Sequence, residues 1–284
     1  MARILDGRQV VAALNEKLRE QVAVLGGKEI VPTLAIVRVG ERSDDIAYER
    51  GAVKRCATIG VETKCMTYPG DMSQQQLLDV IKGINNDGNI HGCLLFRPLP
   101  KHMDDSVVRN ALCPNKDVDG ITDGSLAGVF AGIPTGFPPC TPRACMEILD
   151  FFGMDLTGKR VVVIGRSLVV GKPVAMMLLQ KHATVTICHT RTINMPSLCR
   201  EADILIVAAG RAGIVGGDYF REGQVVIDVG INVDDSGNLC GDVNFAEAQD
   251  IVDAITPVPG GVGTVTTSVL VKHVVEAASR TVEG

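Results

Sequence analysis

Apolar positions along the chain recur with two periods, one typical of amphipathic helices and one typical of buried strands. In the first 140 residues, helices are expected over 7–25, over 44–59 and from Ser73 to about Ile81, and strands over 33–40, 62–68 and 92–96. Asp6, Ser43 and Ser73 stand where side-chain caps of these helices are expected. Strands that alternate with helices predict a parallel sheet, with functional residues at the carboxyl ends of its strands.

The second half of the chain shows the same alternation after a stretch rich in glycine and proline, 98–142, which we expect to be irregular. Thr141 is expected to cap a helix over 142–152. Strands are expected at 160–164, 183–188, 203–210 and 225–232, followed by a backbone-dominated loop at 255–263 and a final helix over 265–278. The pattern predicts the α/β class, with two domains that each contain a mostly parallel sheet and flanking helices.

Composition narrows the class of protein. The 284 residues are 46% hydrophobic, which is ample for a buried core, and the net charge of −5 gives no electrostatic case for binding nucleic acid or a membrane surface. No apolar run reaches the roughly 18 residues of a membrane span, and no signal peptide is recognised. The nine cysteines form no C-x-x-C pair, so we expect reduced thiols, a cytoplasmic location and no metal site.

One stretch carries the strongest chemical signal, the run of apolar residues from Arg160 that ends in Gly165 and is followed by Gly171 and Pro173. A strand, a tight glycine turn and a helix that opens near a proline are typical of the first unit of a nucleotide-binding fold. The spacing excludes a Walker A loop, and Arg166-Ser167 replaces the middle glycine of the G-x-G-x-x-G pattern. An ordinary turn without a ligand is the alternative.

The end of the next predicted strand favours a nucleotide. An NAD enzyme places an acidic residue there for the ribose hydroxyls, whereas this chain has Thr190 and Arg191 and no acid. A guanidinium matches the geometry of a phosphate. Arg166 and Arg191 therefore predict a pocket for the extra phosphate of NADP, in a Rossmann-like C-terminal domain.

Several short motifs, in this order and over nearly the whole chain, resemble the methylenetetrahydrofolate dehydrogenase/cyclohydrolase family. They are Val39-Gly40 before a helix with Tyr48, then 98–100 (Pro-Leu-Pro), 116–120 (Lys-Asp-Val-Asp-Gly), 139–142 (Pro-Cys-Thr-Pro), Gly165 to Gly171, 228–232 and 256–263. The resemblance implies two α/β domains around a cleft, a homodimer, and oxidation of 5,10-methylenetetrahydrofolate with NADP in one-carbon metabolism. It also implies a folate-binding catalytic domain of residues 1–141 with the C-terminal helix 265–284, and an NADP-binding domain of residues 142–264.

The resemblance also implies the site. Tyr48 and Asp119 would be catalytic, with Asp119 accepting N–H bonds from the pterin. The substrate-binding residues would be Tyr48, Leu95, Phe96, Arg97, Asp119, Pro259, Gly260, Gly261 and Gly263. The cofactor-binding residues would be Gly165, Arg166, Ser167, Gly171, Thr190, Arg191 and Ile231. Without the resemblance, Asp119 would be interpreted as a turn residue before Gly120, and Tyr48 equally well as a partly buried helix residue.

Two positions depart from the family pattern. The catalytic lysine of the family would be four residues after Tyr48, where this chain has Ala52, and its glutamine partner would be two residues before Pro98, where this chain has Phe96. Lys54 points off that face of the helix, and Arg55 keeps its proton near neutral pH. Smaller departures are Ser43-Asp44-Asp45 and Thr264.

Three functions remain open from the sequence. The first is an NADP-dependent dehydrogenase with a weak or lost cyclohydrolase step, because hydride transfer needs orientation whereas hydrolysis needs proton movement. The second is a fully bifunctional enzyme in which Arg55, Arg97 or another group replaces the lysine. The third is a non-catalytic, regulatory NADP-binding protein whose folate cleft Phe96 has filled.

Overall fold

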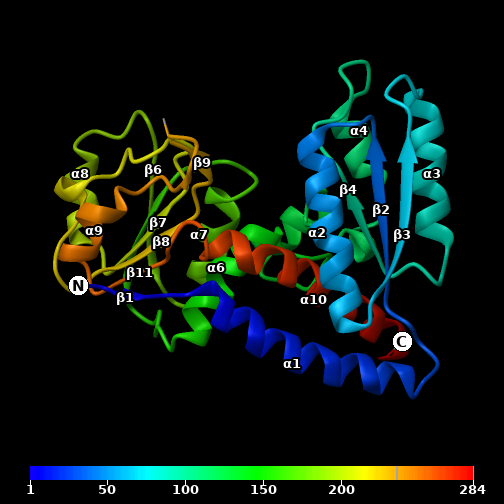
Figure 1. The fold of residues 1–284 in the computed structure, drawn as a ribbon, viewed down its shortest axis with the longest axis horizontal. Helices are drawn as coiled ribbons and strands as arrows, with labels where there is room; N and C mark the ends of the chain where they lie inside the picture. Colours follow the sequence, from blue (N-terminus) through cyan, green and yellow to red (C-terminus); the bar gives the residue numbers. More distant parts are fainter. Residues whose placement is uncertain (235, 284) are drawn as a thin grey trace. The chain divides into compact units, whose positions relative to one another are not determined.

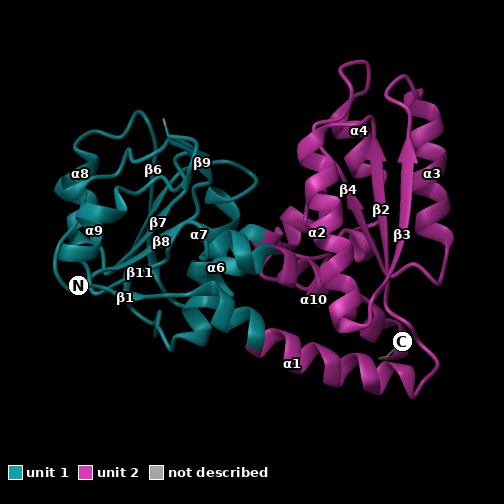
Figure 2. Cartoon of the chain, in the orientation of Figure 1, with its two compact units in different colours: residues 1–12, 141–266 teal, residues 13–140, 267–284 magenta. Residues whose placement is uncertain are grey.

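The computed structural model describes residues 1–234 and 236–283, which fold into two compact units (Figure 2). Unit 1 contains residues 1–12 and 141–266, and unit 2 contains residues 13–140 and 267–284. The expected division placed the first twelve residues with the folate-side domain, whereas in the structure they group with unit 1. They belong to unit 1 because strand β1 (Arg3–Ile4) pairs with β11 (Ala254–Ile255) at the edge of its sheet.

Unit 2 is built on three parallel strands in the order β3-β2-β4: β3 (Glu62–Tyr68), β2 (Thr33–Val39) and β4 (Gly92–Leu95). All seven residues of β2 are buried, as expected of a central parallel strand covered on both faces. Helices α2 (Ser43–Ile59) and α3 (Gln74–Asn86) flank the sheet in Figure 1. Leu77, Ile81 and Ile84 of α3 pack on the strand face that carries Val37 and Leu95.

Side-chain caps were predicted for three helices in the first 140 residues, and two of the three are present in the structure. Asp6 Oδ1 accepts from the amide of Arg8 at 2.9 Å and so caps α1 (Gly7–Gly26). Ser73 and Gln76 form a reciprocal capping box at the start of α3. Ser43 does not cap α2, because the helix begins at Ser43 itself and the preceding Arg42 makes no side-chain cap.

The stretch 98–142 is less irregular than its composition predicts. It contains α4 (Asp105–Asn110), the 3-10 turn η1 (Pro114–Lys116) and α5 (Asp123–Ala131), each too short for a clear apolar period. The expected cap at Thr141 is also wrong, because α6 (Cys140–Phe151) already includes this residue.

Unit 1 contains a six-stranded sheet in the order β1-β11-β8-β7-β5-β6, and every pairing in it is parallel. The remaining strands are β5 (Arg160–Ile164), β6 (Thr184–Cys188), β7 (Ile204–Val207) and β8 (Val225–Asp228). The chain runs from β5 outward to β6 and then returns to the other side of β5 for β7. Ligands of open α/β sheets bind at such a reversal, outside the carboxyl ends of the strands.

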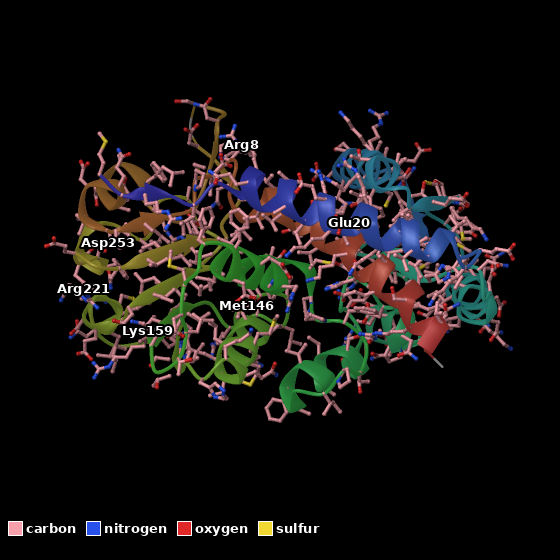
Figure 3. The ribbon with its side chains drawn as sticks, turned by 90° about the horizontal axis from the view of Figure 1, so that it is seen from below. Arg8, Glu20, Met146, Lys159, Arg221 and Asp253 are labelled. Atoms are coloured by element: carbon pink, nitrogen blue, oxygen red, sulfur yellow. The ribbon has the colours of Figure 1, made fainter. Side chains whose placement is uncertain are left out.

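Helices and a buried core complete unit 1. The helices include α7 (Gly171–Gln180), α8 (Met195–Glu201) and α9 (Phe245–Ile251), and the last two pack with β5, β7, β8 and β11 into one apolar cluster. Smaller elements are the 3-10 turn η2 (Gly217–Tyr219) and the antiparallel pair β9 (Asn232–Val233) and β10 (Leu239–Cys240). Met146 of α6, labelled in Figure 3, is 1% exposed.

Polar contacts close the amino-terminal end of the unit 1 sheet, where Lys159, Arg221 and Asp253 precede or lie near strand starts (Figure 3). Arg221 donates to the carbonyl of Ala202 at 3.0 Å, and Asp253 accepts from the amide of Gly223 at 3.1 Å. These hydrogen bonds connect the loops at the amino-terminal end of the sheet, and the candidate site residues lie at the carboxyl end.

The last helix, α10 (Val262–Glu283), begins three residues before the expected start and continues beyond the expected end. None of the helices in the described residues is long and apolar enough to cross a membrane.

Candidate functional site

The turn after β5 in unit 1 has the shape of a phosphate cradle. Gly165 has a φ of +132°, and a Cβ atom there would overlap with the carbonyl oxygen of Ala208. A Cβ atom at Gly171 would overlap with the carbonyl of Gly165. Because the turn excludes side chains at both points and leads directly into α7, its backbone can approach an anion at the helix start. The residues present therefore fit a dinucleotide.

The predicted basic residues stand at the same end of the sheet. Gly165 donates to the carbonyl of Cys188 at 2.9 Å, which aligns the turn after β5 with the turn after β6. The side chains of Arg166 and Ser167 in the first turn, and of Thr190 and Arg191 in the second, are exposed. Neither turn contains a carboxylate. Both guanidinium groups are thus accessible to a phosphate at this edge.

The remaining unit 1 predictions lie on the loops after β8 and β11. Ile231 is 66% exposed and follows β8, and its Cδ1 atom lies 3.2 Å from where a Cβ atom of Gly263 would be. Gly260 has a φ of +105°, and a Cβ atom at Gly261 would overlap with the carbonyl oxygen of Pro257. Pro259, which precedes them, is exposed. The glycines of this loop are therefore required by its backbone, whatever they bind.

Two buried carboxylates support these loops: Asp228, which begins the 228–232 motif but was assigned no role, and Asp242, which lies outside the motifs. Asp228 is 3% exposed and accepts from the amides of Gly230, Asp242 and Val243 at 2.9–3.1 Å. Burial raises the pKa of Asp228 to about 6, and the three amides oppose that rise. Asp242 is fully buried and accepts from the loop after β7. A Gly-Asp pair in a loop carries no signal that would have identified this role.

In unit 2, Tyr48 of α2 lies against Phe96, the residue after β4. Their rings meet edge to face, with centroids 6.0 Å apart and an interplanar angle of 84°. Tyr48 keeps 37% of its surface exposed, and its hydroxyl is hydrogen-bonded to Thr267. Burial of this hydroxyl, together with the nearby Asp119 and Cys140, raises the pKa of Tyr48 well above its usual value. The structure therefore brings together three of the predicted substrate residues.

Asp119 is the most perturbed carboxyl group of unit 2. It is half-buried, and loss of solvation raises its pKa to about 6, while a hydrogen bond with the thiol of Cys140 lowers it. The next residue, Gly120, has a φ of +68°, and a Cβ atom there would overlap with the backbone at Pro139. This close approach fixes the turn that contains Asp119. Asp119 can therefore be both a turn residue and a residue that binds substrate.

Cys140 and His273 extend this group, and neither was singled out from the sequence. The thiol of Cys140 donates to the carbonyl of Val118 at 3.4 Å, and His273 Nδ1 lies 2.8 Å from the same carbonyl and 3.9 Å from the sulfur. Burial is the first cause that raises the pKa of Cys140, followed by the charge of Asp119. The motif at 139–142 contains Cys140, and this was the signal that could have identified it.

Ala52 and Phe96 stand where the lysine and the glutamine of the family were expected, and both side chains are apolar. Ala52 is completely buried, four residues after Tyr48 on α2, and Phe96 is half-buried. Leu95 was expected to bind substrate, but its side chain is 3% exposed and packs in the core beneath the sheet. Any contact from Leu95 would therefore come from its backbone.

Arg97 already has a partner. Its guanidinium donates twice to the carboxylate of Asp105, with Nε 2.6 Å from Oδ1, and Asp105 also lies 3.8 Å from Arg109. This bidentate pair raises the pKa of Arg97, so its proton is held still more tightly than in free arginine. Arg97 supplies positive charge near Asp119 but is a poor acid or base.

Comparisons with known proteins match both halves of the chain. A family model described as "Tetrahydrofolate dehydrogenase/cyclohydrolase, catalytic domain" matches residues 5–119, and one described as "Tetrahydrofolate dehydrogenase/cyclohydrolase, NAD(P)-binding domain" matches residues 139–282. The "Bifunctional protein FolD" of Carboxydothermus hydrogenoformans is 55% identical over 279 residues, which cover 98% of this chain and 97% of the relative.

Solved structures agree with these matches. The bifunctional FolD enzyme of Campylobacter jejuni has a TM-score of 0.96 at 37% identity and covers 99% of this chain and 100% of its own. The Trypanosoma brucei enzyme, solved with NADP cofactor and an inhibitor, has a TM-score of 0.92 at 35% identity and covers 100% of this chain and 99% of its own. Both likenesses extend over the two units rather than over one of them.

Proposed function

The chain belongs to the tetrahydrofolate dehydrogenase/cyclohydrolase family, and from this premise we propose that it oxidises 5,10-methylenetetrahydrofolate with NADP and has a weak or absent cyclohydrolase step. The observation that carries the second part is that two side chains without ionisable groups stand near Tyr48: Ala52 is buried on the same helix, and the ring of Phe96 contacts the ring of Tyr48. We further expect a homodimer, as the family resemblance implies.

The dehydrogenase step needs few chemical groups from the protein. Bound NADP accepts the hydride, and the product cation is delocalised over the two nitrogens of the substrate, so no base is required. The chain has to bind and orient the pterin, and Asp119 offers two acceptor oxygens to its N–H donors. The edge-to-face pair of Tyr48 and Phe96 provides a flat apolar surface for the ring system.

The hydrolytic step needs proton movement close to the reacting carbon. A lysine of adjusted pKa and a glutamine that orients it would supply this, and the chain has Ala52 and Phe96 at the matching positions. Arg97 is committed to Asp105 and does not release its proton near neutral pH. The second function, a fully bifunctional enzyme, would need another group to move the proton; Asp119 lies close to Tyr48 and Arg97, and burial raises its pKa to about 6.

The preference for NADP rests on Arg166 and Arg191, which are exposed at the carboxyl ends of β5 and β6. Two guanidinium groups without a neighbouring acid favour a ribose phosphate over free ribose hydroxyls. Their accessibility supports the preference.

The deciding experiment follows methenyl formation and methenyl decay separately, on purified protein with methylenetetrahydrofolate and NADP. We expect methenyltetrahydrofolate to accumulate, with decay close to its spontaneous rate in buffer. Ala52→Lys alone should help little, because an ammonium group at a fully buried position loses solvation, and Phe96 offers no hydrogen bond to replace it. Ala52→Lys with Phe96→Gln should gain hydrolysis by more than the product of the single effects, as expected of groups that act as one unit.

The matched control is Ala47→Lys, which adds the same side chain to the same helix at an exposed position and should leave both steps unchanged. Rapid enzyme-dependent decay in the wild type would favour the bifunctional enzyme instead. NADP binding without any turnover would favour the non-catalytic homologue.

A further inference from the structure

Asp242 makes an unusual set of contacts for a residue outside the motifs of the sequence. It is 0% exposed, and both of its carboxylate oxygens are fully engaged. Oδ2 accepts from the amides of Ala209 and Gly210 at 2.6 and 2.8 Å, and Oδ1 accepts from the amide of Arg211 and the side-chain amide of Asn232, both at 2.9 Å. Four N–H groups therefore converge on one carboxylate.

These four donors come from two loops at the carboxyl end of the unit 1 sheet. The amides of 209–211 belong to the loop after β7, which lies directly against the glycine turn, since the carbonyl of Ala208 occupies the space of a Cβ atom at Gly165. Asn232 follows Ile231 in the loop after β8. Asp242 thus connects the segment that follows β7 with the segment that follows β8. These two strands are neighbours, and β7 is next to β5, where the strand order reverses.

Asp228 fixes the backbone of Asp242. One oxygen of Asp228 accepts from the amides of Gly230 and Asp242 at 2.9 and 3.1 Å, and the other accepts from Val243 at 3.0 Å. Gly230 and Gly241 allow this contact, because a Cβ atom on either would overlap with the carboxyl group of Asp242 or Asp228. The described residues show no ion pair to either carboxylate, so backbone and side-chain amides balance both charges.

We infer that Asp242 is a positioning residue for the cofactor, because its carboxylate holds the loops at 208–211 and 230–232 in one preformed arrangement beside the glycine turn. A preformed loop loses less conformational freedom when a ligand binds, so its affinity for that ligand is higher. The amides of 209, 210 and 211 all donate to Asp242, and without this carboxylate they would have no acceptor in their present conformation. The inference rests on the proposed function in one respect, that the ligand at this edge is NADP.

The test is Asp242→Asn, which keeps the shape of the side chain and replaces one acceptor oxygen with an N–H donor that faces other donors. We expect the Kd for NADP, measured by titration calorimetry on the full chain, to rise about tenfold or more. The KM for methylenetetrahydrofolate should change less than twofold, because most of its candidate residues, such as Tyr48 and Asp119, lie in unit 2, and those of unit 1, at 259–263, are not among the donors to Asp242. Asn232→Ala removes one of the four donors and should raise the Kd for NADP about threefold, which keeps the inference testable if Asp242→Asn does not fold.

The matched control is Asp234→Asn. Asp234 is an exposed aspartate that also accepts backbone amides, from Ser236 and Asn238 at 2.9 and 2.8 Å, but both donors lie within four residues of it, so it joins no distant segments. Its variant should bind NADP within twofold of the wild type. A lowered melting temperature with an unchanged Kd in both Asp242→Asn and Asn232→Ala would assign Asp242 a purely structural role and overturn the inference. A wild type that does not bind NADP would instead overturn the proposed function, and the inference with it.

Discussion

The two units build their candidate ligand sites in opposite ways. Unit 1 uses backbone: glycines that exclude side chains, loops tied by buried carboxylates, and two exposed arginines. Unit 2 uses side chains: an aromatic pair, a half-buried carboxyl group and a thiol, whose pKa values are raised. If the proposed function is correct, the contrast explains how Phe96 at a glutamine position can affect one chemical step and leave the candidate nucleotide cradle complete. A backbone cradle is fixed by geometry, whereas a side-chain site changes with each residue.

Among the variants that should affect one unit and not the other, Gly171→Ala is expected to have the largest effect. Gly171→Ala places a methyl group onto the carbonyl of Gly165, where only backbone could give way, so unit 1 should lose about 3 kcal/mol or more of unfolding free energy and its affinity for NADP. Denaturant unfolding and a cofactor titration measure the two losses. Gly83→Ala is the control, because this helical glycine has open space around it and the alanine should stabilise α3 by up to about 1 kcal/mol. Wild-type affinity in Gly171→Ala would show that the turn is not the cradle.

The next effect is expected at Asp119 and should be confined to unit 2. Asp119→Asn replaces an acceptor with a donor that faces the donors of the pterin, which costs about 1–3 kcal/mol of folate binding and leaves NADP binding intact. The pH dependence of the folate Kd gives a second test of the role of Asp119. With a pKa of about 6, the wild-type carboxyl group loses its charge as the pH falls, so the folate Kd should rise below about pH 6, whereas the asparagine variant should show no such rise.

Equilibrium titration of a folate ligand between pH 5 and 8 is the measurement for Asp119. Asp79→Asn, an exposed carboxylate on α3 of the same unit, should follow the wild-type profile. A folate affinity that is independent of pH in the wild type and unchanged in Asp119→Asn would leave Asp119 as a turn residue only.

The smallest effect is expected at Arg166, because it is exposed and its charge is screened. Arg166→Ala should raise the KM for NADP several-fold and leave the KM for NAD nearly unchanged, since only NADP carries the extra phosphate. Steady-state kinetics with both cofactors measures the difference. Equal losses with NADP and NAD would remove Arg166 from the phosphate pocket.

The comparison of the units also explains what the sequence could predict. The strands, the long helices and the glycine turn were predicted because their signals are local: an apolar period, a cap such as Ser73, or a glycine at a fixed distance from a strand. The family resemblance named the residues of the site, and the structure brings Tyr48, Phe96 and Asp119 together.

What the sequence could not predict depends on contacts between distant segments. Asp242 meets residues 30 or more positions away, and nothing near it in the chain indicates this. The side chain of Leu95 belongs to the core because of the register of β4 against β2, which pairs it with Val37. The short helices α4 and α5 have too few residues for a period, and the place of residues 1–12 in unit 1 follows from a two-residue strand.

That two-residue strand, β1, has a consequence for the order in which the protein can be completed on the ribosome. Its partner β11 begins at residue 254, so β1 cannot pair, and this edge of the sheet cannot form, until that segment has been made. The three strands of the other sheet are all present once residue 95 has been made. Closing so long a loop adds an entropic barrier that grows only slowly with its length, but contacts of such separation slow folding. During synthesis, all strands of the unit 2 sheet are therefore available long before β1 can pair.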